Sequence, residues 1–310
     1  MTKTRDSSSF LTDFTLKLRE RNALPKRIEV SEVGATILAN SFDKESTETI
    51  SEFIYTGMDS DPSVAVLKSL VERAERYAFS DGYRRGLKSC STERSDGFAA
   101  FPKGISDRPE EIARKNAFEE AVERYVWASW WDRPNLAHKV SVYDRSRASA
   151  LSKNLLEQID RYVEAEEIKL VQPKIDPSLG LSVKLYFLFL RPYGVVSGGA
   201  CGPTTSENQT EYRALCELYR HAVAVSRMRE NNRIPSTFYE QRLSFFGNGE
   251  AGQKILENRL CQEGTDTIYL PRLSIDEQVP HQMDDLIAVH RCYFENQPPF
   301  VGGKLERLCL

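Results

Sequence analysis

The six-residue pattern Glu-x-x-Glu-Arg-Tyr occurs twice in this chain, at Glu72–Tyr77 and again at Glu120–Tyr125, 48 positions apart. Both copies lie in helix-like stretches that follow a glycine-bearing loop. On a helix, side chains three positions apart are neighbours with about 5–6 Å between Cβ atoms, and like charges there are destabilising. The repeat therefore predicts a cation between the carboxylates. Mg²⁺ is the simplest choice, because it takes oxygen ligands and bridges carboxylates to phosphates.

A solvated helix face is the alternative interpretation of each copy. Charged residues are common on exposed helices, and Arg76 or Arg124 could neutralise the neighbouring carboxylates. One copy alone would favour this simpler interpretation. Two copies in matching sequence contexts favour a shared functional role.

The composition is that of an ordinary globular protein. The chain has 310 residues, of which 40% are hydrophobic and 28% are charged, and its net charge is −3. This balance provides no basic surface for nucleic acid or anionic lipid. The N-terminus lacks the apolar core of a signal peptide, and the longest apolar run, 183–190, is too short to span a membrane. We therefore expect a cytoplasmic protein with no nucleic-acid or membrane partner.

Other catalytic and metal-binding patterns are absent from the sequence. The six cysteines are scattered without a Cys-x-x-Cys pair, and the four histidines show no metal-ligand spacing. This pattern argues against a zinc site or a disulfide framework, so we expect reduced thiols. No P-loop, dinucleotide fingerprint or nucleophile elbow is present, and no catalytic residue can be assigned.

The chain is predicted to be one α+β domain over residues 27–310, after a polar, loosely ordered lead-in over residues 1–26. The expected strands are 27–40, 48–56, 180–190 and 267–273. The expected helices are one that begins at Asp61-Pro62, one from Pro109 to Trp131, one over 155–165, and one opened by Ser206–Gln209 with capping-box spacing. The tryptophans near the end of the second helix are expected in the core.

A glycine-bearing loop precedes an acidic helix three times. The three pairs are Gly57 before Glu72, Gly97 before Glu120, and Gly199 in the run 195–203 before Glu217. Three such units could bring their acidic faces to one cavity. We therefore predict a single domain in which the three glycine-loop/acidic-helix units line one nucleotide cleft.

The ordered combination of these motifs resembles the YcaO family of ATP-utilising, peptide-modifying enzymes, over residues of about 55–230. The family's first signature, Ser-x-x-Glu-x-x-Glu-Arg, is matched by Ser69, Glu72, Glu75 and Arg76. Its second resembles Ser95-Asp-Gly97-Phe-Ala99 followed by Ala117-Phe-Glu-Glu120-Ala-Val-Glu123-Arg124. Its third, an Arg-Ala-Leu-Thr-Glu-type helix, resembles Arg213-Ala-Leu-Cys-Glu217.

The resemblance implies a nucleotide cleft in which helix carboxylates bind Mg²⁺ ions that hold the phosphates of ATP. The implied Mg²⁺ ligands are Glu72, Glu75, Glu120, Glu123 and Glu217. The implied nucleotide-binding residues are Ser69, Arg76, Ser95, Arg124 and Arg213.

The resemblance also implies a reaction class, namely ATP-dependent activation of a peptide backbone amide. Cyclodehydration of Cys, Ser or Thr to azolines in a ribosomally made peptide is the expected outcome. Thioamidation stays open, because the chain ends at 305–310 without the alternating prolines of many azoline-forming members. A non-catalytic scaffold subunit of a modification complex also stays open. We expect a peptide substrate and a partner protein that presents it, and a homodimer is compatible with the sequence.

Overall fold

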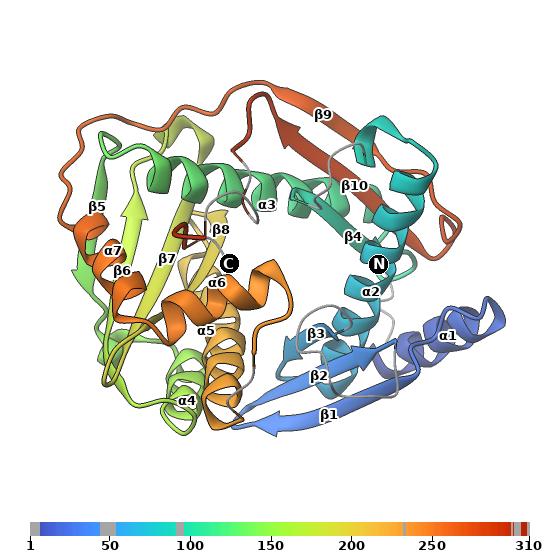
Figure 1. The fold of residues 1–310 in the computed structure, drawn as a ribbon. Helices are drawn as coiled ribbons and strands as arrows, with labels where there is room; N and C mark the ends of the chain where they lie inside the picture. The colour runs from blue at the N-terminus through green and yellow to red at the C-terminus, as the bar shows by residue number, and fades with distance from the viewer. Residues whose placement is uncertain are drawn as a thin grey trace. The chain divides into compact units, whose positions relative to one another are not determined.

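The computed structural model describes residues 7–43, 54–90, 96–231, 234–298, 300 and 305–308. The chain divides into two compact units. Unit 1 comprises Met1–Ala121 and Arg272–Glu295, and unit 2 comprises Val122–Pro271 and Asn296–Leu310. Helices and sheets occur in both units (Figure 1), so the predicted α+β class is confirmed. Among the described residues, no helix combines the length and the apolar character needed to cross a bilayer.

The first sheet of unit 1 is an antiparallel meander in the order β1-β2-β3. Its strands are β1 (Arg27–Val33), β2 (Thr36–Phe42) and β3 (Ile54–Asp59). Helix α2 (Pro62–Arg84) follows β3 directly and packs against this sheet. Its start agrees with the prediction, because the Asp61 side chain caps the helix by accepting from Ser63 N at 2.8 Å.

Residues 7–20, which we expected in a loosely ordered lead-in, instead form helix α1 (Ser7–Glu20). Phe10, Phe14 and Leu18 recur every four residues and are buried in a core shared with α2. This four-residue spacing is present in the sequence, but the polar and charged residues around it suggested a loosely ordered segment. The expectation of a loose lead-in was therefore wrong for these residues.

The second sheet of unit 1 is antiparallel with the order β4-β10-β9. Its strands are β4 (Phe98–Pro102), β10 (Ile287–Phe294) and β9 (Leu273–Gln278), and the short 3₁₀ helix η1 (Lys88–Cys90) precedes it in the chain. Gly97 enters β4 with a φ of 68°, and a Cβ there would lie 1.9 Å from the Cys292 carbonyl oxygen. The strand expected over 267–273 was misplaced, since β9 begins only at Leu273.

Helix α3 (Pro109–Asp132) matches the predicted second helix and passes without interruption from unit 1 into unit 2. Trp127 and Trp130, in the unit 2 part of the helix, are fully buried, as expected of core residues. Trp127 packs edge-on against Phe187 and Phe300.

Unit 2 is built on a four-stranded antiparallel sheet in the order β5-β6-β7-β8. The strands are β5 (His138–Val142), β6 (Ala165–Pro173), β7 (Leu181–Leu190) and β8 (Val195–Pro203). The helices are α4 (Ala150–Ile159), α5 (Glu207–Glu230), α6 (Phe238–Gly247) and α7 (Glu250–Leu260), with 3₁₀ turns η2 (Arg145–Arg147) and η3 (Pro177–Leu179). Helix α5 packs on β8 and β7. Strand β7 was predicted to be buried, and its residues from Val183 to Leu190 are buried.

Three local predictions for unit 2 need correction. Residues 195–203 form strand β8 rather than a glycine loop. The capping box predicted at Ser206 is absent, because the side chain of this N-cap residue makes no capping hydrogen bond. The helix expected over 155–165 is α4, which ends at Ile159, and Ala165 already begins β6.

Candidate functional site

Glu72 on α2 is hydrogen-bonded to strand β3. Its Oε2 accepts a hydrogen bond from Thr56 N at 2.7 Å. Gly57 makes this approach possible, because a Cβ there would lie 1.9 Å from the Ala65 carbonyl oxygen and 2.7 Å from Ser69 N. The glycine that suggested a loop is thus a strand residue that allows the helix to contact the sheet closely.

Glu75, one turn further along α2, accepts a hydrogen bond from Ala100 N of β4 at 3.1 Å. Burial raises its pKa from 4.5 to about 8; the charge of Arg76 lowers the pKa, and the carboxylates of Glu120 and Glu72 raise it. Three carboxylates of unit 1 therefore influence one another electrostatically. At neutral pH, Glu75 holds a proton unless another cation takes the proton's place.

Unit 2 repeats this construction on β8 and α5. The Oε2 of Glu217 accepts a hydrogen bond from Gly199 N at 2.8 Å. A Cβ on the preceding Gly198 would lie 2.3 Å from the Ala214 carbonyl oxygen and 2.5 Å from Leu218 N. In each unit, a strand glycine permits a close helix, and the helix glutamate then accepts the N–H of a residue next to that glycine.

Arg124 lies between two of the predicted carboxylate ligands of unit 2. Its Nη1 is 3.7 Å from Glu123 Oε1, and its Nη2 is 3.9 Å from Glu217 Oε1. Its guanidinium carbon lies 4.0 Å from the centre of the Phe300 ring. The three charged side chains are at most 17% exposed, so their charges interact strongly with one another.

Helix α3 carries predicted ligands in both units. Glu120 belongs to the part of the helix in unit 1, and Glu123 belongs to the part in unit 2. The structure therefore gathers Glu72, Glu75 and Glu120 in unit 1, and Glu123, Arg124 and Glu217 in unit 2.

The remaining predicted nucleotide-binding residues differ in their placement. Ser69 is fully buried, and its hydroxyl donates to the Val66 carbonyl and pairs with the Ser41 hydroxyl at 2.8 Å, so it serves helix–sheet packing. Arg213 is exposed on α5 and donates to the Cys201 carbonyl oxygen at 3.2 Å. Arg76 is half-buried beside Glu75 on α2, and Ser95 lies outside the described residues.

Arg291 on β10 is a charged residue near the carboxylates of unit 1 that was not predicted from the sequence. It is fully buried, and burial lowers the pKa of its guanidinium, while the charges of Asp96 and Glu120 raise it. The surrounding aromatic rings are those of Phe79, Phe98 and Tyr293. A lone arginine in a buried strand carries no motif, so only the structure places it near the carboxylates of unit 1.

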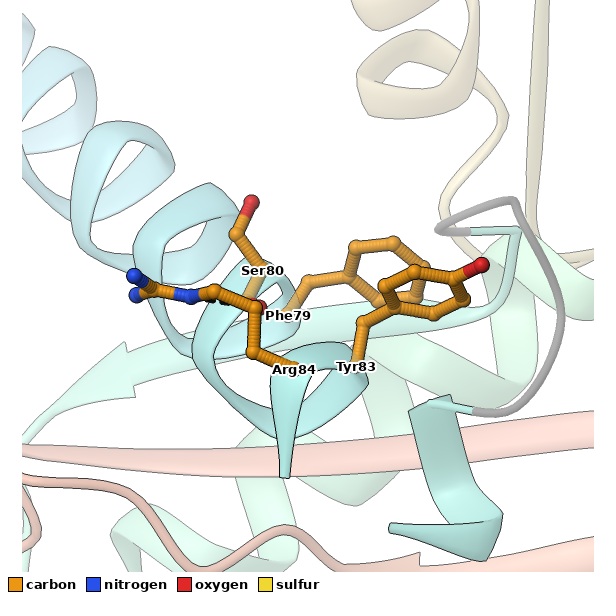
Figure 2. A pocket seen from close by; sticks show the side chains of 4 residues that line it. All are labelled: Phe79, Ser80, Tyr83 and Arg84. Atoms are coloured by element: carbon orange, nitrogen blue, oxygen red, sulfur yellow. Dashed lines mark hydrogen bonds between the residues drawn. The ribbon is translucent and has the colours of Figure 1, made fainter. Parts of the chain in front are cut away.

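A shallow surface pocket of about 370 Å³ lies elsewhere in unit 1, on α2. Figure 2 shows its lining side chains, which are Phe79, Ser80, Tyr83 and Arg84. They belong to the C-terminal part of the helix and include none of the predicted ligands. This pocket therefore does not mark the carboxylate site.

The chain is similar to known proteins at the level of solved structures. No protein-family profile and no curated protein sequence matches the chain. The structure of YcaO from Methanopyrus kandleri bound with AMPPCP and Mg²⁺ is similar at 15% identity, over 96% of this chain and 92% of that one, with a TM-score of 0.60.

The microcin synthetase McbBCD complex of E. coli is also similar, at 9% identity over 88% of each chain, with a TM-score of 0.56. The same complex with pro-MccB17 bound gives a TM-score of 0.58 at the same identity and coverage. Identities this low establish the fold alone. The chain has the fold of the YcaO proteins, as its ordered sequence motifs predicted.

Proposed function

We propose that this protein binds Mg-ATP through the glutamates of α2, α3 and α5 and uses it to activate a backbone amide of a peptide. The observation that carries the proposal is the recurrent placement of Glu72, Glu75 and Glu217. Each uses one carboxylate oxygen to accept a strand N–H, which fixes the carboxylate in position. The second oxygen of a carboxylate held in this way is suited to a metal ion.

The electrostatics of unit 1 support a cation at these side chains. Glu75 has a raised pKa because it is buried near Glu72 and Glu120. Such a group of carboxylates destabilises the protein unless protons or cations neutralise it. Mg²⁺ would supply that charge, and the ATP analogue and Mg²⁺ bound to the Methanopyrus kandleri YcaO support this choice.

The charges of the remaining predicted residues suggest their roles in binding Mg-ATP. We assign Glu123 and Glu217 of unit 2 to Mg²⁺ as well, and Arg124, which lies between them, to a phosphate oxygen or to orientation of the carboxylates. We assign the same role to Arg76, whose charge lowers the pKa of Glu75. Because its hydroxyl is used within the fold, we leave Ser69 out of the nucleotide-binding set.

Bound ATP would supply the phosphoryl group that turns the amide oxygen into a leaving group. Attack by a neighbouring Cys, Ser or Thr side chain of the substrate would then give an azoline, and we propose this cyclodehydration as the reaction. The enzyme needs no nucleophile of its own for it. The microcin synthetase McbBCD complex with pro-MccB17 bound supports a peptide substrate and partner proteins for this chain.

Two experiments test this proposal at different levels. Calorimetry should show Mg-dependent ATP binding that is lost in Glu72→Gln and Glu217→Gln and retained in the control Glu111→Gln, whose exposed side chain pairs with Arg108. Unchanged affinity in both site variants would refute the assignment of the ligands.

Mass spectrometry of a candidate peptide incubated with the protein, its partner and Mg-ATP tests the chemistry. Loss of one water per modified residue is expected for cyclodehydration, whereas exchange of oxygen for sulfur would indicate thioamidation. ATP turnover without any change in peptide mass would favour the scaffold alternative.

A further inference from the structure

A second group of possible metal ligands lies in unit 1, on the sheet β4-β10-β9, and includes none of the predicted magnesium ligands. It consists of Asp276 on β9 and of His290 and Cys292 on β10. Asp276 and Cys292 are directly paired across the two strands, and His290 lies two residues from Cys292, on the same face of β10. These strands run side by side in Figure 1. One ligand atom from each residue lies within 4.8 Å of the other two.

The contacts within the group are short and converge on one oxygen. His290 Nε2 is 2.8 Å from Asp276 Oδ1, and Cys292 Sγ is 3.7 Å from the same atom. Arg114 of α3 donates to both oxygens of this carboxylate, with Nε at 2.9 Å and Nη2 at 2.6 Å. The carboxylate is thereby oriented from outside, in the way that outer hydrogen-bond partners orient metal-binding carboxylates.

Two of the three residues are buried, and the third is partly exposed to solvent. The Cys292 thiol is fully buried and His290 is nearly so, while the Asp276 side chain is 30% exposed. An ion could therefore enter from the carboxylate side and reach donors that bulk water does not reach freely. Arg114 has an exposed side chain, so it can adjust when a cation binds.

We propose that Asp276, His290 and Cys292 form a Zn²⁺ site. One nitrogen, one sulfur and one oxygen donor suit this borderline ion, which binds imidazole, thiolate and carboxylate in tetrahedral sites and can take water as a fourth ligand. A thiol ligand disfavours Mg²⁺, so this site is chemically distinct from the glutamate site. Binding would release the thiol proton to solvent and would tie β9 to β10 beside the unit 1 part of α3.

Cobalt titration of the full-length, tag-free protein tests the proposal. After treatment with a chelator, one equivalent of Co²⁺ should produce the charge-transfer absorption of a cobalt–thiolate bond, and one equivalent of Zn²⁺ should abolish it. Cys292→Ser should remove the thiolate band, and His290→Gln should weaken Zn²⁺ binding by at least about tenfold, since even outer-shell changes cost about 10–100-fold. The control Cys261→Ser removes an exposed thiol of unit 2 and should leave the spectrum unchanged.

The alternative is a purely hydrogen-bonded network of Asp276, His290 and Arg114. In that case Co²⁺ would give no thiolate band, or a band that survives in Cys292→Ser, and either result overturns the proposal. Zn²⁺-dependent thermal stabilisation provides a second measurement. A rise in the melting temperature of the wild type that is lost in His290→Gln supports the site, and an equal rise in both proteins contradicts it.

Discussion

Replacing Glu75 by glutamine should stabilise the protein in the absence of metal and nucleotide. The pKa of this carboxyl is raised from 4.5 to about 8, chiefly by burial. At pH 7 the unfolded chain has therefore released a proton that the folded chain retains, which costs about 3 kcal/mol of stability at about 1.4 kcal/mol per pH unit. Glutamine carries no charge and can still accept from Ala100 N. Because Glu75 is only partly shielded from water, the shift in its pKa costs less than full burial would, and we expect a net gain of about 1–3 kcal/mol.

The gain should depend on pH in a defined direction. Below pH 4.5 the carboxyl is protonated in both the folded and the unfolded chain, so the wild type and Glu75→Gln should be similarly stable. Between pH 4.5 and about pH 8 the unfolded chain loses the proton that the folded chain keeps, so wild-type stability falls as the pH rises. Above about pH 8 the difference between the two proteins should stop growing.

Urea denaturation in a chelating buffer, at about pH 5 and about pH 8, measures this difference. The control Glu111→Gln alters an exposed side chain and should change stability by less than about 0.5 kcal/mol at either pH. Mg-ATP should then stabilise the wild type and fail to stabilise Glu75→Gln. If the two proteins show the same stability at both pH values, the surroundings of Glu75 do not raise the pKa of its carboxyl, and the prediction is refuted.

Three further predictions test the supports of the site. Gly198→Ala should cost at least about 2 kcal/mol in chemical denaturation, because the new Cβ would lie 2.3 Å from a backbone oxygen of α5; a near-neutral result would contradict the close approach of strand and helix. Arg124→Met should destabilise the metal-free protein by up to about 3 kcal/mol, because it removes the positive charge beside two poorly exposed carboxylates. Mg²⁺ should restore part of the loss in a thermal melt, and full stability without Mg²⁺ would argue against the pairing. Phe14→Ala should cost about 3 kcal/mol, whereas Leu16→Ala on the exposed face of α1 should cost little; equal effects would show that α1 does not belong to the core.

The helices that carry the glutamates could be predicted because their signals are local. Asp61 and Pro62 mark the start of α2, and the apolar spacing along α2 shows which of its faces is buried. The order of the motifs was sufficient to predict the fold. The helix signals depend on neighbours within a few positions in the chain, whereas the fold was predicted from the resemblance of the ordered motifs to the YcaO family.

Two glycines were misinterpreted as loop residues, because tertiary packing requires glycine at these positions. Gly57 and Gly198 resemble loop residues in composition, yet both lie in strands where a helix backbone leaves no room for a Cβ. Ser69 fits a family motif, but its hydroxyl is used by Ser41, which is distant in sequence. A contact with a residue far along the chain leaves no periodic trace in a single sequence.

The Asp276, His290 and Cys292 group was missed for the same reason. His-x-Cys is too short to be a metal motif, and the aspartate comes from a neighbouring strand. The sequence argued against a zinc site because its cysteines and histidines show no metal-ligand spacing along the chain. Strand pairing brings together donors that no spacing rule would connect.

A crystal structure of the protein with Mn²⁺ and a non-hydrolysable ATP analogue would test the central claim most directly. We expect anomalous peaks within bonding distance of Glu72, Glu75 or Glu120, or of Glu123 or Glu217, with the nucleotide phosphates bound to a metal ion at these residues. Metal peaks and nucleotide density away from all five glutamates would contradict it.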